Sequence, residues 1–377
     1  MTTNLSAKEM VDRDHDFMKV ALSLANRGIG NTWPNPSVGC VIVKNNIIIS
    51  RGWTQPGGRP HAEVEALMRA GCRSDGATAY VSLEPCSHFG ETPPCSQALV
   101  KAGIKRVVVS SRDRDKRVSG SGIKFLKNSG VKVIENVLID ESEFLNVGFF
   151  SKIIKGRPNL TLKLATSLDG KIATKTGDSK WITGTIARRY GHFLRMKHDA
   201  VLVGSGTALI DNPLLTCRIN GINNKRRTRI VLDGQLRLSL DSQLVQTAMD
   251  TPVILFTNDT NKTDPKKIDE LLEKGVTVIK SPYSIEGIDL EYVLARLAKI
   301  GITRVLIESG GTLASSCLKA NLIDEIFWFR SPSIIGNDGL PAIHSLGLDS
   351  IDKVYRYDKK SSMSFGDDVM DHLLPIN

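Results

Sequence analysis

The stretch His61–Cys95, HAEVEALMRAGCRSDGATAYVSLEPCSHFGETPPC, places one histidine, one glutamate two residues later and two proline-flanked cysteines in a short piece of chain. Its first part, residues 61–71, predicts a helix that ends at Gly71, and ATAYVSLEP predicts a strand that stops at Pro85. PPCSQALVKAG predicts another helix with its proline pair at the start. This alternation of helices and strands predicts a layered α/β domain with a central sheet.

His61, Cys86 and Cys95 are residue types that zinc prefers, and a catalytic zinc site has three protein ligands with the fourth position kept for water. If His61 begins a helix, Glu63 diverges from it and becomes a candidate general acid and base rather than a ligand. A His-x-Glu followed by Pro-Cys and a second Cys is the signature of zinc-dependent base deaminases. Two alternatives stay open: cysteines that only pack in turns, and a closed structural site with His88 as fourth ligand.

One feature departs from that signature, because its two cysteines are two residues apart. In this chain eight residues, SHFGETPP, separate the two cysteines. The spacing therefore implies either a deaminase branch with a longer loop or a different kind of site.

Length and composition favour a two-domain protein of the cytoplasm. A chain of 377 residues exceeds one ordinary core, and the strand–helix rhythm restarts after residues 150–157. We therefore expect one domain over 1–153 and a second over 154–377. No apolar run approaches the roughly 20 residues of a membrane span, and six scattered cysteines do not suggest a disulfide framework. These observations predict a cytoplasmic protein that does not associate with a membrane.

The net charge of +10 does not indicate a nucleic-acid partner. Residues 1–150 carry 19 Lys and Arg against 15 Asp and Glu, and the rest carry 31 against 25, so the excess is spread out. A single-strand binder needs a basic track with stacking aromatics, whereas aromatics make up 6% of this chain. A diffuse positive charge suits a small phosphorylated substrate.

The remaining elements extend the α/β pattern over the whole chain. Residues 11–28 have helical spacing, and residues 38–53 predict a hairpin that turns at Asn45 and Asn46. In the second half, strands are expected within residues 199–207, 226–234, 252–258, 275–280, 303–311 and 325–332. A helix is expected from Thr312, directly after a Gly-Gly turn. Its backbone N–H groups could bind an anion, although such glycines also serve as simple turns.

Several longer motifs follow one another in a familiar order: PNPSVGCVIV, GGRPHAEVEAL, VSLEPCSHFGETPPC, LKLATSLDGKIA, WITG, DAVLVGSGTALIDNPLLTCR and IESGGTLASSCLKANLIDE. In the sequence and order of these motifs, the chain resembles the bifunctional riboflavin-biosynthesis family over nearly its whole length. That family joins a diaminohydroxyphosphoribosylaminopyrimidine deaminase to a 5-amino-6-(5-phosphoribosylamino)uracil reductase. The resemblance implies that His61, Cys86 and Cys95 bind one zinc ion and that Glu63 shuttles the proton. The long loop between the cysteines is what this branch shows.

The resemblance also implies a fold and a set of contacts. We expect an N-terminal cytidine-deaminase-like layered domain and a C-terminal dihydrofolate-reductase-like domain, with NADPH across the carboxyl ends of the strands. The implied cofactor contacts are Ala165, Trp181, Thr207, Asp211, Gly234, Gly310, Gly311, Thr312, Leu313, Ala314, Ser315 and Ser316. The implied substrate contacts are Ser179, Arg195, Leu215, Arg218 and Glu308. Lys163 and Asp211 are candidates for proton handling at the sugar, and association into a homo-oligomer through the reductase half is expected.

Two positions differ from the family's usual text. Glu91 stands where the family has Arg or Lys, and RDRDKRVSGSG, residues 112–122, replaces its usual loop. Asn35 and His88 resemble residues that line the deaminase pocket; the alternatives are a turn-forming Asn and a loop His. A nucleic-acid-editing deaminase and a zinc module without catalysis are the rival functions, and the first leaves the second half without a role.

Overall fold

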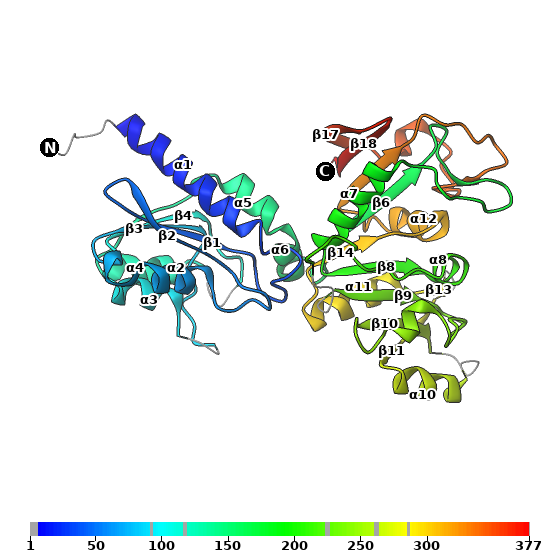
Figure 1. The fold of residues 1–377 in the computed structure, drawn as a ribbon, viewed down its shortest axis with the longest axis horizontal. Coiled ribbons are helices and arrows are strands. Elements are labelled where there is room, and N and C mark those ends of the chain that lie inside the picture. The colour runs from blue at the N-terminus through cyan, green and yellow to red at the C-terminus, as the bar shows by residue number, and fades with distance from the viewer. Residues whose placement is uncertain are drawn as a thin grey trace. The chain divides into compact units, whose positions relative to one another are not determined.

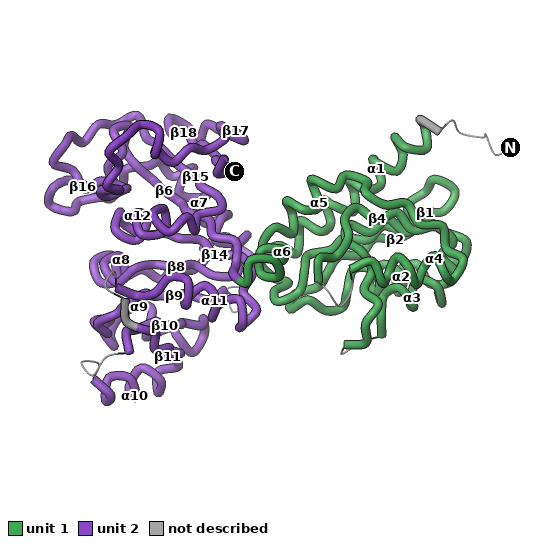
Figure 2. Tube along the Cα trace, turned by 180° about the vertical axis from the view of Figure 1, so that it is seen from behind, with its two compact units in different colours: residues 1–156 green, residues 157–377 purple. Residues whose placement is uncertain are grey.

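The computed structural model describes residues 7–90, 93–115, 119–222, 227–259, 264–284 and 287–376. It divides into two compact units, Met1–Gly156 and Arg157–Asn377 (Figure 2). The boundary expected at residues 153 and 154 falls in the last turn of helix α6 (Val147–Ile154), shortly before this division.

The first unit is built on a five-stranded sheet in the order β2-β1-β3-β4-β5 (Figure 1). β1 pairs antiparallel with β2 and β3, whereas β3, β4 and β5 run parallel. The strands are β1 (Gly39–Lys44), β2 (Ile47–Trp53), β3 (Thr78–Leu83), β4 (Arg106–Ser111) and β5 (Lys132–Ile134). The β1–β2 hairpin turns at Asn45 and Asn46, with φ angles of 51° and 62°. Asparagine tolerates this left-handed conformation, and the predicted hairpin is confirmed.

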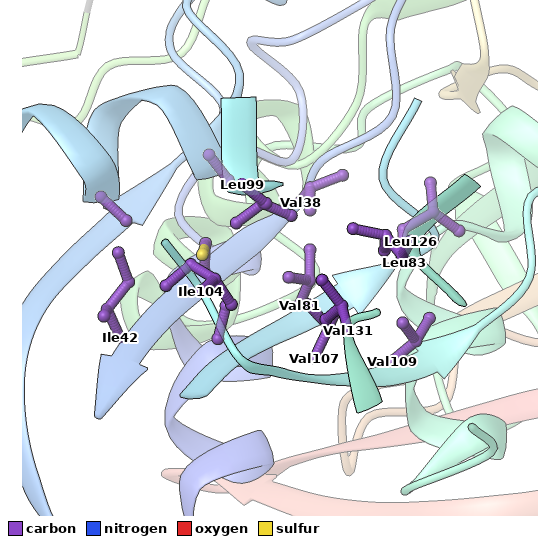
Figure 3. Close-up of a cluster of buried hydrophobic side chains, with 14 of the residues drawn as sticks. Val38, Ile42, Val81, Leu83, Leu99, Ile104, Val107, Val109, Leu126 and Val131 are labelled. Carbon is purple, nitrogen blue, oxygen red and sulfur yellow. The ribbon is translucent and has the colours of Figure 1, made fainter. Parts of the chain in front are cut away.

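Helices cover both faces of this sheet (Figure 1). They are α1 (Ala7–Ala25), α2 (Ala62–Ala70), α3 (Cys95–Lys101), α4 (Ser121–Asn128), α5 (Ile139–Leu145) and α6, with a 3₁₀ turn at Gly71–Ser74. The expected helix over 11–28 begins earlier and ends at Ala25. Alternate residues of β1 enter two separate cores: Cys40 and Ile42 pack with α2 and α3 (Figure 3), and Val41 and Val43 pack with α1. The predicted layered α/β domain is therefore confirmed.

The second unit contains a nine-stranded sheet in the order β11-β10-β9-β8-β14-β6-β15-β18-β17. The first seven of these strands run parallel to one another. β18 pairs antiparallel with β15, and β17 pairs antiparallel with β18. The strands are β6 (Asn159–Thr166), β8 (Ala200–Gly204), β9 (Thr228–Leu232), β10 (Val253–Asn258), β11 (Val276–Ser281), β14 (Arg304–Ile307), β15 (Glu325–Arg330), β17 (Tyr357–Phe365) and β18 (Asp368–Pro375). Two short pairs complete the unit, β7 (Lys171–Ala173) with β16 (Leu340–Pro341) and β12 (Tyr283–Ser284) with β13 (Gly287–Ile288).

The helices of this unit connect the parallel strands. They are α7 (Thr185–Met196), α8 (Ser205–Asp211), α9 (Gln243–Gln246), α10 (Pro265–Glu273), α11 (Leu290–Ile300) and α12 (Gly311–Lys319), with a 3₁₀ turn at Ile351–Lys353. Strands β9, β8, β14 and β6 are neighbours that run in one direction, so the loops after them meet at one edge of the sheet. Among the residues that the structure describes, no helix is both long and apolar enough to cross a bilayer.

Candidate active sites

The three side chains predicted as zinc ligands come together in the first unit. His61 is the residue before α2, Cys86 lies in the loop after β3, and Cys95 begins α3. Their ligand atoms all lie within 4.8 Å of one another. His61 Nδ1 is 3.2 Å from the Cys95 sulfur and 3.7 Å from the Cys86 sulfur.

These distances fit a zinc ion. Tetrahedral zinc with its usual bonds to sulfur and nitrogen separates the two kinds of ligand atom by about 3.6 Å. Hydrogen bonds from Cys95 and His61 lower the pKa of Cys86 to about 4, although burial opposes them, so its thiolate is favoured. Thiolate is the form that binds zinc. Within the described ranges no fourth His, Cys, Asp or Glu joins this group, which argues against a closed structural site.

Glu63 lies beside the group in the first turn of α2 but is not one of its members. Its side chain is 3% exposed. Burial raises the pKa of Glu63 to about 7, against the opposing effect of positive charge on His61. A carboxyl group with a pKa in this range can accept a proton and return it at neutral pH.

The two pocket candidates differ in their contacts. The Asn35 side-chain amide donates to the Gly58 carbonyl oxygen at 3.1 Å, so it joins two loops that are 23 residues apart in the chain. His88 Nδ1 is buried and has no hydrogen-bond partner among the described residues, so it remains available to a bound molecule. Glu91 and residues 116–118 of the altered 112–122 loop lie outside the described residues.

Glu84 is a functional candidate that the sequence reasoning missed. The residue is 4% exposed, and its carboxylate accepts hydrogen bonds from four backbone N–H groups between residues 113 and 123, at 3.0 to 3.3 Å. It thereby ties the loop that carries Cys86 to the beginning of α4. The only signal in the sequence was a glutamate directly before Pro85 and Cys86 at the end of a predicted strand.

In the second unit, most of the predicted cofactor contacts gather at the carboxyl edge of the parallel strands. Ala165 is near the end of β6, Thr207 follows β8, Gly234 follows β9, and residues 310–316 follow β14 and begin α12. This edge is where open α/β sheets bind their ligands. Trp181 lies between β7 and α7 and is 67% exposed, with the Arg188 guanidinium 4.4 Å from its ring centre.

Three predicted substrate and proton-handling residues form one ionic cluster. Arg195 and Glu308 make a bidentate pair with distances of 2.6 Å and 3.0 Å, and Lys163 Nζ is 4.0 Å from the same carboxylate. Burial would raise the pKa of Glu308, but the Arg195 charge outweighs it and the pKa is about 2. Burial lowers the pKa of Lys163, with Arg195 acting in the same direction. The ionised Glu308 therefore holds two cations.

Arg218 meets a residue that the sequence reasoning did not select, His192. The backbone N–H and Nε of Arg218 each lie 3.3 Å from a ring nitrogen of His192. Burial and the charges of Arg195 and Arg218 lower the pKa of His192 to about 4, so the ring is neutral at neutral pH. Only the fold could reveal this residue, because a histidine inside a helix carries no distinctive motif.

The other predicted residues of this unit are Leu215, Ser179 and Asp211, and among the described residues none of their side chains forms a hydrogen bond or ion pair with the ionic cluster. Leu215 is buried with a φ of 53°, and Ser179 is half-buried in the loop before α7. Asp211 is exposed at the end of α8, and in the described part of the chain no hydrogen bond or ion pair joins it to Lys163. Lys163 and Asp211 therefore stay separate candidates for proton handling at the sugar.

Two family models match the chain. The RibD C-terminal domain matches residues 158–370, and the cytidine and deoxycytidylate deaminase zinc-binding region matches residues 11–111. The chain is 42% identical over 357 residues to the riboflavin biosynthesis protein RibD of Aquifex aeolicus, a match that covers 95% of this chain and 97% of the relative.

Solved structures give the same result. RibD of Acinetobacter baumannii is 35% identical with a TM-score of 0.88, and the match covers 97% of this chain and 100% of that one. A diaminohydroxyphosphoribosylaminopyrimidine deaminase/5-amino-6-(5-phosphoribosylamino)uracil reductase from Thermotoga maritima is 35% identical with a TM-score of 0.86 and the same coverage. The chain thus combines a zinc-binding deaminase domain with a reductase domain of the kind that uses NADPH. It belongs to the RibD family, the bifunctional deaminases and reductases of riboflavin biosynthesis.

Proposed function

We propose that the first unit hydrolytically deaminates 2,5-diamino-6-(5-phosphoribosylamino)pyrimidin-4-one and that the second reduces the ribosyl side chain of the product to ribityl with NADPH. The observation that carries the proposal is the group of His61, Cys86 and Cys95 within 4.8 Å, with the buried Glu63 beside it. The ionic cluster of Lys163 and its partners supports the reductase half.

In the deaminase unit, His61, Cys86 and Cys95 would hold zinc, which supplies a Lewis acid that activates water for attack on the amine-bearing pyrimidine carbon. Glu63 accepts the proton from the attacking water and passes it to the departing amine nitrogen, which leaves as ammonia. Its burial keeps its pKa near the working pH. His88, whose buried Nδ1 has no hydrogen-bond partner among the described residues, would contact the substrate.

In the reductase unit, residues at the carboxyl edge would hold NADPH, which supplies the hydride. Arg218 suits the substrate phosphate, because a guanidinium group pairs with its oxygens in a fork. The fork of Arg195 is already engaged by Glu308, so Arg195 would hold that carboxylate in place beside the substrate. Lys163 is a buried ammonium beside Glu308 with a lowered pKa, and we assign to it the proton that the ribosyl ring oxygen takes up as the sugar opens. Association into a homo-oligomer through this unit stays a prediction that sedimentation can test.

The test is to incubate the full chain with the pyrimidine phosphate, with and without NADPH, and to follow ammonia and nicotinamide absorbance together. We expect ammonia in both reactions and oxidation of NADPH only after ammonia has been released. Zinc-dependent release of ammonia also excludes a zinc module without catalysis. If no ammonia appears from the zinc-loaded protein, the deaminase assignment is wrong.

A further inference from the structure

Arg237 spans two strand ends at the carboxyl edge of the second unit's sheet. β8 and β9 are parallel neighbours with Gly204 opposite Leu232, so the residues that follow these two positions are adjacent. Arg237 Nη2 donates to the hydroxyl of Ser205, directly after β8, at 2.7 Å. Its Nε lies 3.8 Å from a carboxylate oxygen of Asp233, directly after β9.

The guanidinium is fixed on one side and open on the other. The Arg237 side chain is 52% exposed, whereas that of Asp233 is fully buried. The second carboxylate oxygen of Asp233 accepts the Leu238 N–H at 2.7 Å. The remaining N–H donors of the guanidinium fork are therefore the ones that a molecule bound at this edge would meet.

Arg237 does more than neutralise Asp233. The nearer oxygen, Oδ1, is buried without a hydrogen-bond partner, because the guanidinium stands 3.8 Å away and donates to Ser205 instead. A cation placed only to satisfy a buried carboxylate would donate to it directly, as Arg195 does to Glu308. The orientation of the fork is thus set toward the β8 loop and the open edge.

The Arg237 guanidinium lies close in the chain fold to residues that are expected to contact the cofactor. Thr207 and Gly234, two of the expected cofactor contacts, lie two residues beyond Ser205 and one residue beyond Asp233. In α/β dinucleotide sites, an acidic side chain near the strand end binds the ribose 2′-hydroxyl of NAD, whereas a nearby arginine accommodates the 2′-phosphate of NADP. Here the Asp233 side chain is fully buried and the Arg237 side chain is 52% exposed, so of these two the arginine is the one that a ribose at this edge would meet.

We propose that the Arg237 guanidinium, oriented by Ser205, binds the 2′-phosphate of NADPH and sets the preference of the reductase for NADPH over NADH. This inference rests on the proposed reductase function. It adds a specificity residue to the cofactor contacts that the family resemblance implies.

The test compares the full-length wild type with Arg237→Ala by steady-state reduction of the deaminated substrate, using NADPH and NADH in turn. A charge-assisted hydrogen bond to phosphate makes the expected rise in KM for NADPH about ten- to a hundredfold. KM for NADH should stay unchanged. Arg237→Lys keeps a charge beside Asp233 but loses the fork, so it should fold as the wild type does and show a smaller loss with NADPH.

Lys280→Ala is the matched control. The Lys280 side chain lies near the end of β11, is comparably exposed (53%), and its Nζ is 3.4 Å from the Asp259 carboxylate. It should leave both cofactors unaffected. Calorimetric titration with adenosine 2′,5′-bisphosphate and with AMP gives a readout without turnover. The wild type should bind adenosine 2′,5′-bisphosphate more tightly than AMP. Arg237→Ala should bind these two nucleotides with the same affinity.

The outcomes separate this inference from the function on which it rests. If Arg237→Ala weakens NADPH and NADH equally, or changes neither, the 2′-phosphate assignment is overturned while the reductase assignment stands. If the wild type oxidises neither cofactor with the deaminated substrate, the proposed reductase function is wrong and the inference falls with it.

Discussion

Replacing Glu63 by Gln tests the division of labour in the deaminase unit. The amide has the shape of the carboxyl group but cannot take up a proton, and general acid–base catalysis contributes typically 10²–10⁴-fold. We therefore expect kcat/KM for ammonia release to fall by about two to four orders of magnitude. Zinc content should not change, because no oxygen of Glu63 belongs to the group formed by His61, Cys86 and Cys95.

The fold of this variant should also be intact. The Glu63 side chain is buried, and burial raises its pKa to about 7, so its surroundings favour the neutral form of the carboxyl group. A neutral amide of equal size therefore introduces no new buried charge. Reductase turnover, measured with the deaminated substrate and NADPH, should equal that of the wild type because its residues lie in the other unit.

Glu65→Gln is the matched control on the same helix. Glu65 pairs with Arg69 at 2.7 Å four residues along α2, so its loss should leave ammonia release unchanged. The assay is ammonia release by purified, zinc-loaded full-length protein, with metal analysis of the same samples. Deamination that survives in Glu63→Gln, or zinc that is lost from it, would refute the role assigned here.

Three further predictions concern stability and metal binding. The pKa of His192 is about 4 in the folded chain and about 6.5 in the unfolded chain, so the unfolded state binds more protons between these two pH values. The wild type should therefore lose stability as the pH falls from 6.5 to 4. His192→Asn should lose that part of the pH dependence in thermal unfolding. Arg195→Ala removes the bidentate partner of the buried Glu308 and leaves Lys163 at 4.0 Å, so it should destabilise the second unit by about 3–5 kcal/mol in denaturant unfolding. Arg330→Ala breaks a more exposed ion pair and should cost under about 1 kcal/mol, so equal losses in the two variants would contradict the reasoning. Gly122→Ala would place a Cβ against the carbonyl oxygen of the residue before Cys86. We therefore expect weaker zinc retention during dialysis against a chelator. Retention equal to that of the wild type would show that this contact does not position the loop.

The sequence was most informative where local chemistry determines local structure. Asn and Gly readily adopt the conformations that turns and helix starts require. They account for the predicted turn at Asn45 and Asn46. They also account for the predicted start of α12, which was placed at Thr312, one residue after the observed start. The zinc group could be anticipated because the residue types and their order are dictated by the metal. The strand expected within residues 226–234 is likewise confirmed as β9, all of whose residues are buried.

What the sequence could not provide depends on contacts between distant segments. β17 has polar residues along almost its whole length and is exposed at the sheet edge, so no apolar alternation marks it as a strand. His192 and Glu84 gain their roles from partners 26 residues or more away in the chain. Arg237 gains its role from the adjacency of two strand ends, which only the sheet order shows.

X-ray absorption at the zinc edge of the purified full-length protein tests the central claim most directly. The account predicts one zinc per chain, with two sulfur neighbours at about 2.3 Å and the remaining nitrogen and oxygen neighbours at about 2.0–2.1 Å. Replacing Cys86 by Ser should remove one sulfur from this shell. A shell of four protein ligands, or a protein that retains no zinc, would contradict the account.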